Sequence, residues 1–269
     1  MAELMEIEFT HSGNVAWIWL NRPKVHNALN RDLLDALTAT IRSLPKQEPA
    51  RILVIGGRGP SFCAGADLGD MKASANATRE DNLADAKRIG RLFDAVATCP
   101  RPVLMRVHGN VFGGGVGLVA ASDIAIGTVD STFAISEVRL GIIPGLISPY
   151  LLRRMGDGRA RPLMLSGQRF DGKHAHEIGL LQEAVEPQHL EHAMEVRLVE
   201  LLKAGPEAQA RVKEILRLNA DNTFGEVLER VPDELADTRS GKEAKEGFNA
   251  FFEKRKPAWI PELEGAGDR

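Results

Sequence analysis

The chain has 269 residues and a formal net charge of −3, which fits one large domain or one domain with a small appendage. Its hydrophobic share of 43% and charged share of 26% are typical of a globular protein, and the lack of a basic excess argues against nucleic-acid binding. The two cysteines, Cys63 and Cys99, are too few for a disulfide framework. No stretch has the roughly 20 apolar residues of a membrane span, and the acidic first residues are unlike a targeting peptide. We therefore expect a cytoplasmic protein with no membrane or nucleic-acid partner.

The N-terminal part alternates between strand and helix patterns. Met5–Phe9 and Val15–Leu20 predict two strands joined by a turn. Asn30 is a predicted N-cap, because apolar residues repeat at helical spacing through Leu33–Leu44. The apolar, β-branched run Ile52–Ile55 predicts a buried strand.

Glycine-rich stretches then alternate with further strand and helix patterns. In chain order we expect a loop at Gly56–Gly69, a helix at Asp81–Ala97 and a strand at Val103–Val107. A turn at Gly109–Gly115, a helix at Val116–Ala121 and a strand at Ile124–Ile126 follow. Strands that alternate with helices in this way predict a mostly parallel sheet with right-handed crossovers.

From about residue 190 the pattern becomes helical throughout. Leu190–Lys203, Glu207–Leu218 and Lys242–Lys254 predict helices with no strands between them. We therefore expect an α/β core with the active site at residues 1–195 and a helical C-terminal region at residues 196–269.

Two glycine-rich loops, at residues 61–68 and 108–118, follow two predicted strands. Ligands bind at the carboxyl ends of parallel strands, so each loop could aim a backbone N–H at one point and form an oxyanion hole. When each loop is taken alone, tight packing is the better explanation. The second loop has neither GxGxxG nor the Gly-Lys-Ser/Thr of a P-loop, which argues against a dinucleotide or ATP.

Several blocks, in this order and spacing, resemble the crotonase, or enoyl-CoA hydratase/isomerase, family. They cover nearly the whole chain: Asn21-Arg22-Pro23 with Asn27-Ala28-Leu29, Phe62 through Leu68, Arg101 through Ile124, Phe133 through Gly145, and Phe251 through Pro257. The resemblance implies a spiral core of stacked ββα units and a helical C-terminal trimerisation region. It also implies a homo-oligomer, either a trimer or a dimer of trimers.

The resemblance further implies an acyl-CoA thioester as substrate. It implies no metal and no separate cofactor, since coenzyme A is part of the substrate. The oxyanion donors would be the backbone N–H groups of Ala66 and Gly114. The other residues implied to bind the substrate, the last two of them from a neighbouring subunit, are Lys24, Val25, Ala64, Asp67, Leu68, Gly113, Phe251 and Lys254.

The chain departs from the family's hydratases at one of their two catalytic glutamates. The first position is Gly117 here, whereas the second is Glu137, which the resemblance makes the acid/base. The position that holds an aspartate in some dienoyl isomerases and dehalogenases of the family is Gly145. Apolar neighbours of Glu137 are expected to raise its pKa by desolvation, which suits a group that gives and takes a proton.

Three functions remain open with one glutamate. The leading hypothesis is an enoyl-CoA hydratase, a lyase. Residues 112–126 and 136–150 resemble the methylglutaconyl-CoA hydratase group of leucine breakdown, whose substrates bear a distal carboxylate. Arg106 and Arg139 are candidate partners for that carboxylate. The alternatives are a Δ3,Δ2-enoyl-CoA isomerase that uses Glu137 alone, and a non-catalytic CoA-binding protein.

Overall fold

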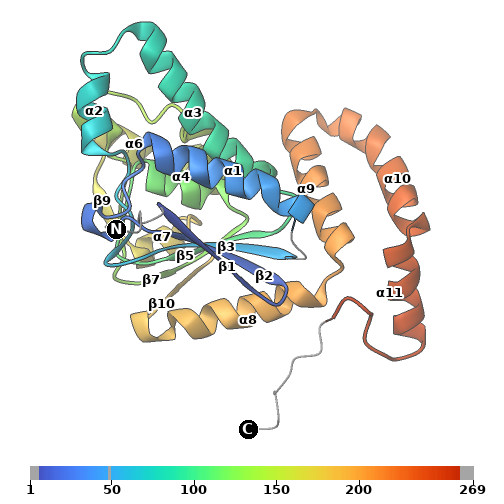
Figure 1. The fold of residues 1–269 in the computed structure, drawn as a ribbon. Coiled ribbons are helices and arrows are strands. Elements are labelled where there is room, and N and C mark those ends of the chain that lie inside the picture. Colours follow the sequence, from blue (N-terminus) through green and yellow to red (C-terminus); the bar gives the residue numbers. More distant parts are fainter. Residues whose placement is uncertain (1–5, 48–49, 261–269) are drawn as a thin grey trace. The chain divides into compact units, whose positions relative to one another are not determined.

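The computed structural model describes residues 6–47 and 50–260, which form parts of two compact units (Figure 1). The first unit takes in Met1–Cys99 and Val103–Glu195, and the second takes in Pro100–Pro102 and Val196–Arg269. Both ends of the chain, including Met5 of the first predicted strand, lie outside the described residues. Within the described ranges, none of the helices has the length and apolar character that a membrane crossing requires.

A six-stranded sheet forms the centre of the first unit. In spatial order its strands are β1 (Ile7–Ser12), β2 (Val15–Leu20), β3 (Ile52–Gly57), β5 (Val103–Val107), β7 (Ile124–Thr128) and β10 (Glu183–Val185). β1 pairs antiparallel with β2, and each other neighbouring pair is parallel. All residues of β3 are buried, as an inner strand with both faces covered requires. The predicted mostly parallel sheet is confirmed.

A second, four-stranded sheet contains β4 (Ser61–Cys63), β6 (Asn110–Phe112), β8 (Thr132–Ala134) and β9 (Arg169–Asp171). The first three strands run parallel, and each follows a strand of the larger sheet along the chain. Successive turns of the chain therefore give one strand to each sheet, which is the predicted spiral of ββα units. The prediction of an unbroken loop and turn was wrong at β4 and β6, because alternation cannot be recognised in three residues.

Three helices of the first unit matter for the site. α1 (Arg31–Gln47) is N-capped as predicted, because the backbone N–H of Leu33 donates to Asn30 Oδ1 at 2.8 Å. α3 (Arg79–Thr98) begins with a capping box and packs against α1. α4 (Gly114–Ala121), buried from its second residue onward, packs against α3. Figure 1 shows α1 and α4 on the same side of the six-stranded sheet.

The shorter helices of the first unit were not predicted. They are η1 (Pro23–Val25), α2 (Leu68–Ser74), η2 (Glu137–Leu140), α5 (Ser148–Met155), α6 (Asp157–Ser166), α7 (Gly172–Glu177) and η3 (Pro187–His189). α2 begins at Leu68, the last residue of one block that resembles the family, and η2 lies inside another, Phe133 through Gly145.

The second unit is helical in its described part. α9 (Pro206–Asp221), α10 (Phe224–Ser240) and α11 (Lys242–Phe252) follow one another, with α10 in contact with both others. α8 (Leu190–Lys203) spans the boundary between the two units. α10 was missing from the predicted elements, and it carries Pro232 inside the helix, a residue that usually marks a helix end.

Candidate active site

The predicted catalytic residues lie in three loops that follow three adjacent parallel strands. β6 pairs with β4 on one side and with β8 on the other, and the register places Cys63 beside Val111 and Phe112 beside Ala134. The loops after these strands therefore leave the sheet at the same edge. This edge, outside the carboxyl ends of parallel strands, is where α/β proteins bind ligands.

Ala66 lies in the first loop, which is bonded to the chain around Leu29. The backbone N–H of Leu29 donates to the carbonyl of Gly65 at 2.7 Å, and the N–H of Asp67 donates to the carbonyl of Leu29 at 3.2 Å. These two bonds bracket Ala66, which is exposed. Its own N–H donates to no protein acceptor among the described residues. The loop thus holds one free donor in a fixed position.

Gly114 begins α4 in the second loop. The N–H of Gly113 donates to the carbonyl of Ala134 at 2.9 Å, and the N–H of Gly117 donates to the carbonyl of Gly113 at 3.0 Å. The first N–H groups of a helix have no acceptor within the helix. In the part of the chain that the structure describes, the Gly114 N–H has no other protein acceptor either. It also lies at the partially positive end of the helix dipole.

Glycine brings these two loops into contact. A Cβ atom on Gly65 would lie 2.9 Å from the carbonyl oxygen of Phe112 and 3.8 Å from the Cα of Gly113. A Cβ on Gly114 would lie 2.8 Å from a methyl carbon of Leu29, the residue that pairs with the Ala66 loop. The two free N–H groups therefore belong to touching loops, as a two-donor oxyanion hole requires.

Glu137 follows β8 in the third loop and begins η2. Its Oε1 would lie 3.2 Å from a Cβ on Gly113, so the half-buried carboxyl packs against the second loop. Oε2 is buried without a hydrogen-bond partner. Burial raises the pKa of Glu137 above its ordinary value, and the residue's own backbone N–H offsets only part of that shift. The site therefore combines two free donors with a carboxyl that resists ionisation.

Replacing Glu137 with Gln is expected to raise thermal stability at pH 8. A raised pKa in the folded protein means that stability is greatest with the carboxyl neutral and is lost as pH rises through the folded-state pKa. The gain should shrink as pH falls and vanish below the ordinary value of 4.5. Calorimetric melting at pH 4, 6 and 8 measures it. Glu177→Gln, at a side chain that is 70% exposed, should show no such trend; an equal gain there would contradict the explanation.

Gly117 occupies the position of the absent first glutamate, and the structure leaves no room there for a side chain. A Cβ on Gly117 would lie 2.3 Å from Cγ2 of Ile147 and 2.8 Å from two ring carbons of Phe93. Contacts below 3 Å require something to shift. Two apolar side chains therefore fill the space beside α4 that a second carboxyl group would have to enter.

A cavity of about 590 Å³ in the first unit extends from Ala66. It lies among α1, α2, α3 and the loop of η2, and apolar side chains from all four contribute to its wall. Its polar lining residues are Arg31, Asp70, Ser74, Asn82, Asp85 and Arg88. Sequence reasoning missed Arg31 and Arg88, since each occupies a helix position that reads as an ordinary solvated residue.

The two arginines suggested by the sequence are not among the residues that line this cavity. Arg106 forms an ion pair with Glu191, and Arg139 donates from Nε to the carbonyl of Ser166 at 3.1 Å. Both guanidinium groups are thus held by other parts of the first unit.

The structure places the other predicted substrate-binding residues around the first loop. Lys24 and Val25 are exposed in η1, Ala64 is partly buried, and Leu68 is 81% exposed. The carboxylate of Asp67 is engaged within the protein: it forms an ion pair with Arg22 at 2.9 Å and caps α2 through the N–H of Gly69. If Asp67 contacts the substrate, it must do so through the same carboxylate that already binds Arg22 and the N–H of Gly69.

Phe251 and Lys254 belong to the second unit. Phe251 is 76% exposed and meets Phe252 edge to face, with the ring centroids 5.6 Å apart. Lys254 is exposed and has a positive φ of 55°. Their predicted contact with the substrate of a neighbouring subunit stays a prediction.

Comparison with known proteins gives consistent matches. A family model described as "Enoyl-CoA hydratase/isomerase" matches residues 10–262. The chain is 29% identical over 260 residues to the short-chain-enoyl-CoA hydratase of Clostridium acetobutylicum, a match that covers 94% of this chain and 97% of that one. A solved enoyl-CoA hydratase from Shewanella pealeana is 36% identical with a TM-score of 0.91, covering 96% and 97% of the two chains. Pseudomonas aeruginosa AtuE is 33% identical with a TM-score of 0.92, covering 95% and 100%.

Proposed function

The chain belongs to the enoyl-CoA hydratase/isomerase family and is an enzyme of that family, and from this premise we propose that it hydrates 2-enoyl-CoA thioesters. The observation that carries the proposal is the position of the Glu137 carboxyl against Gly113, directly beside the free N–H of Gly114. The hydratase names of several relatives support this choice of reaction.

In the proposed reaction the thioester oxygen accepts hydrogen bonds from the N–H groups of Ala66 and Gly114. When water adds to C3, electrons move through C2 to this oxygen and an enolate forms. Preorganised donors stabilise that charge, and each is worth about 10²–10³ in rate. The partial positive charge at the start of α4 acts in the same direction.

Glu137 is the proposed acid/base. It gives a proton to C2 of the enolate, and the resulting carboxylate takes the proton that the attacking water releases when its oxygen bonds to C3, so Glu137 ends protonated. The reverse reaction runs both transfers backwards. A positioned acid/base contributes about 10²–10⁴ in rate, and a carboxyl with a raised pKa is protonated more often near neutral pH, so that it can act as the acid. No other protein group among the described residues hydrogen-bonds to the buried Oε2, so the carboxyl is not committed to another partner through that oxygen.

The remaining contacts are proposed for the coenzyme. Lys24, Val25 and Leu68 are exposed near the first loop and suit the coenzyme A portion. The proposed oligomer, a trimer or dimer of trimers, would bring Phe251 and Lys254 from a neighbouring subunit to the same ligand. Light scattering on the purified protein tests that assembly, and a monomer would contradict it.

Isomerisation is the second candidate, and Gly117 is the observation that favours it. The hydratases that this chain resembles have a further glutamate at the position of Gly117. In this chain, Phe93 and Ile147 fill the space that such a side chain would need. Glu137 alone suffices to move a proton from C2 to C4 of a 3-enoyl thioester. That transfer shifts the double bond from C3–C4 to C2–C3 and needs no water.

Activity on two substrates decides among the candidates. A hydratase removes the conjugated absorbance of crotonyl-CoA, whereas an isomerase creates that absorbance from a 3-enoyl-CoA. We expect the first change. If neither change occurs and calorimetry still shows thioester binding, the chain is a non-catalytic CoA-binding member and the proposal is wrong.

The finer proposal for the acyl group is methylglutaconyl, from leucine breakdown, which ends in a carboxylate. The resemblance at residues 112–126 and 136–150 supports it. The cavity beside Ala66 offers Arg31 and Arg88 as cationic partners for that carboxylate, alongside the acidic groups of Asp70 and Asp85. A kcat/KM for methylglutaconyl-CoA above that for crotonyl-CoA is the expected result.

A further inference from the structure

We infer that Arg31 selects acyl groups that carry a hydrogen-bond-accepting oxygen at the end remote from the thioester, with a carboxylate preferred. The inference rests on the proposed acyl-CoA activity and goes beyond it, because it names the residue that reads the far end of the acyl chain. It also assigns to Arg31, which lies on a helix outside the sequence motifs, the role that the sequence suggested for Arg106 and Arg139.

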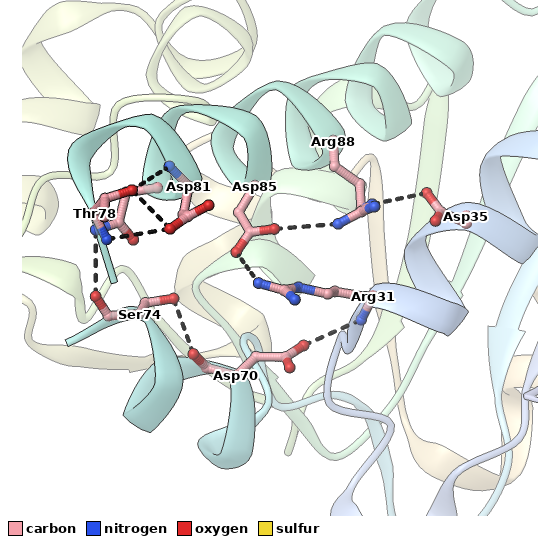
Figure 2. A network of polar contacts seen from close by, with 9 residues as sticks. Arg31, Asp35, Asp70, Ser74, Thr78, Asp81, Asp85 and Arg88 are labelled. Carbon is pink, nitrogen blue, oxygen red and sulfur yellow. Dashed lines mark hydrogen bonds and ion pairs between the residues drawn. The ribbon is translucent and has the colours of Figure 1, made fainter. Parts of the chain in front are cut away.

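Arg31 is the first residue of α1 and is bonded to both α2 and α3. Its backbone N–H donates to Asp70 Oδ2 at 3.1 Å, and Nη2 of its side chain meets Asp85 Oδ2 at 2.5 Å (Figure 2). The side chain is 50% exposed. The residue is thus fixed at its backbone and held at one end of its guanidinium, while half of the side chain's surface is exposed.

Asp85 is shared between Arg31 and Arg88, and the carboxylates of Asp70 and Asp81 also lie close enough to act on the charge of Arg31. The second oxygen of Asp85, Oδ1, accepts from Arg88 Nη1 at 3.1 Å, and Arg88 also donates from Nε to Asp35 at 3.1 Å. A guanidinium has five N–H donors. In the described chain Arg31 donates to Asp85 only from Nη2, which leaves Nε and Nη1 without a protein acceptor. Arg88 donates from both Nε and Nη1, whereas Arg31 donates from Nη2 alone, so Arg31 has more spare donors than Arg88 in the described chain.

The cavity that Arg31 lines is the one that starts at Ala66. A thioester oxygen bonded to the Ala66 N–H would direct the acyl chain along the apolar wall formed by Met71, Ile89 and Ile142. An apolar chain end that displaces water from Arg31 would leave charged donors unbonded, which is costly. An oxygen at that end restores the bonds, and a carboxylate forms charge-assisted bonds about twice as strong as neutral ones.

The wall that carries Asp70 and Asp85 is held in place by its own hydrogen bonds. Ser74 Oγ donates to the carbonyl of Asp70 at 2.9 Å, and Asn82 Nδ2 donates to the carbonyl of Ser74 at 3.3 Å. Thr78, which lies between Ser74 and Asn82 in the sequence, is the N-cap of α3. Figure 2 shows these contacts joining α2 to α3 beside Arg31. A wall that is already fixed reduces the cost of ordering the site when a ligand binds.

The test compares three 2-enoyl-CoA thioesters of equal chain length that end in a methyl, a hydroxyl or a carboxylate. We expect the native enzyme to favour the carboxylate over the methyl by about 10- to 100-fold in kcat/KM, the range of a hydrogen bond to a charged group. Arg31→Met should abolish this preference by raising KM for the carboxylate substrate. Arg31→Lys, which keeps the charge and loses the planar fork, should retain part of it.

Arg42→Met is the matched control. Arg42 lies on the same helix with the same 50% exposure and pairs with Asp94 outside the cavity. It should keep the full preference. Equal discrimination by the native enzyme and Arg31→Met would overturn the inference, as would a native preference for the methyl end. A hydroxyl substrate that matches the carboxylate would show that a neutral acceptor suffices, which supports the selection of an oxygen and removes the preference for charge.

Failure of the proposed activity gives a different result. If the native enzyme turns over none of the three thioesters, the proposed function is wrong, and calorimetric binding of the saturated methyl and carboxylate analogues then tests Arg31. A carboxylate preference in Kd that is lost in Arg31→Met supports the inference. Equal Kd values in the native protein overturn it.

Discussion

Replacing Glu137 with Gln is expected to reduce kcat by about 10²–10⁴, the contribution of a positioned acid/base. The amide has nearly the shape of the carboxyl, so the packing against Gly113 is retained while proton transfer to and from C2 is lost. The affinity for a CoA thioester should stay the same, because the proposed coenzyme contacts lie in η1 and the first loop.

Steady-state kinetics and thioester calorimetry measure this prediction together. Glu177→Gln, at an exposed position on α7, is the control and should keep native kcat. A Glu137→Gln enzyme with near-native turnover would show that another group moves the proton. A loss of thioester binding in parallel with activity would instead assign Glu137 to ligand binding.

Replacing Gly117 is expected to destabilise the fold strongly. Alanine in a helix interior is normally favoured over glycine by about 1 kcal/mol. Here its Cβ would lie 2.3 Å from Ile147, and overpacking of this kind typically costs about 1–3 kcal/mol. Gly117→Ala should therefore lower the free energy of unfolding, and Gly117→Glu should lower it further because its carboxyl would be buried against Phe93 without a partner.

Urea denaturation measures both variants, and Gly158→Ala is the matched control. Gly158 also lies within a helix, but a Cβ there meets nothing within 4 Å, so alanine should be neutral or slightly stabilising. Ile147→Ala in the Gly117→Ala background should recover part of the lost stability by opening space. If Gly117→Ala and Gly158→Ala proved equally stable, the space beside α4 would not be filled as described.

The Gly117 result bears on the reaction as well as on stability. A second carboxyl cannot be restored by changing one residue, because Phe93 and Ile147 would have to move. In either proposed reaction, hydration or isomerisation, Glu137 acts without a carboxyl partner at position 117.

The larger elements could be predicted from the sequence because each is long enough to show its period. The N-cap at Asn30 and the buried strand β5 are examples, and both were correct. β4 and β6 could not be predicted, because each has three residues and is defined by pairing with a distant strand. The resemblance identified Glu137, Ala66 and Gly114 through motif positions, while the contacts among their loops depend on that pairing.

Two features of the site required the structure. Gly117 in the sequence signals only that a glutamate is missing, whereas the filled space depends on Ile147, thirty positions further on and in a different element. Arg31 and Arg88 are charged residues on helices, and only the packing of α1 against α3 brings them to one cavity. Charge on a helix surface predicts solvation by default, so sequence reasoning pointed to Arg106 and Arg139 instead.

Deuterium exchange at C2 of a saturated acyl-CoA tests the central claim most directly, because it reports enolate formation without requiring hydration or isomerisation. The native enzyme in D₂O should exchange a C2 proton of butyryl-CoA, detected by mass spectrometry, and Glu137→Gln should not. Absence of exchange by the native enzyme, or equal exchange by both proteins, would contradict an enolate held by Ala66 and Gly114 and protonated by Glu137.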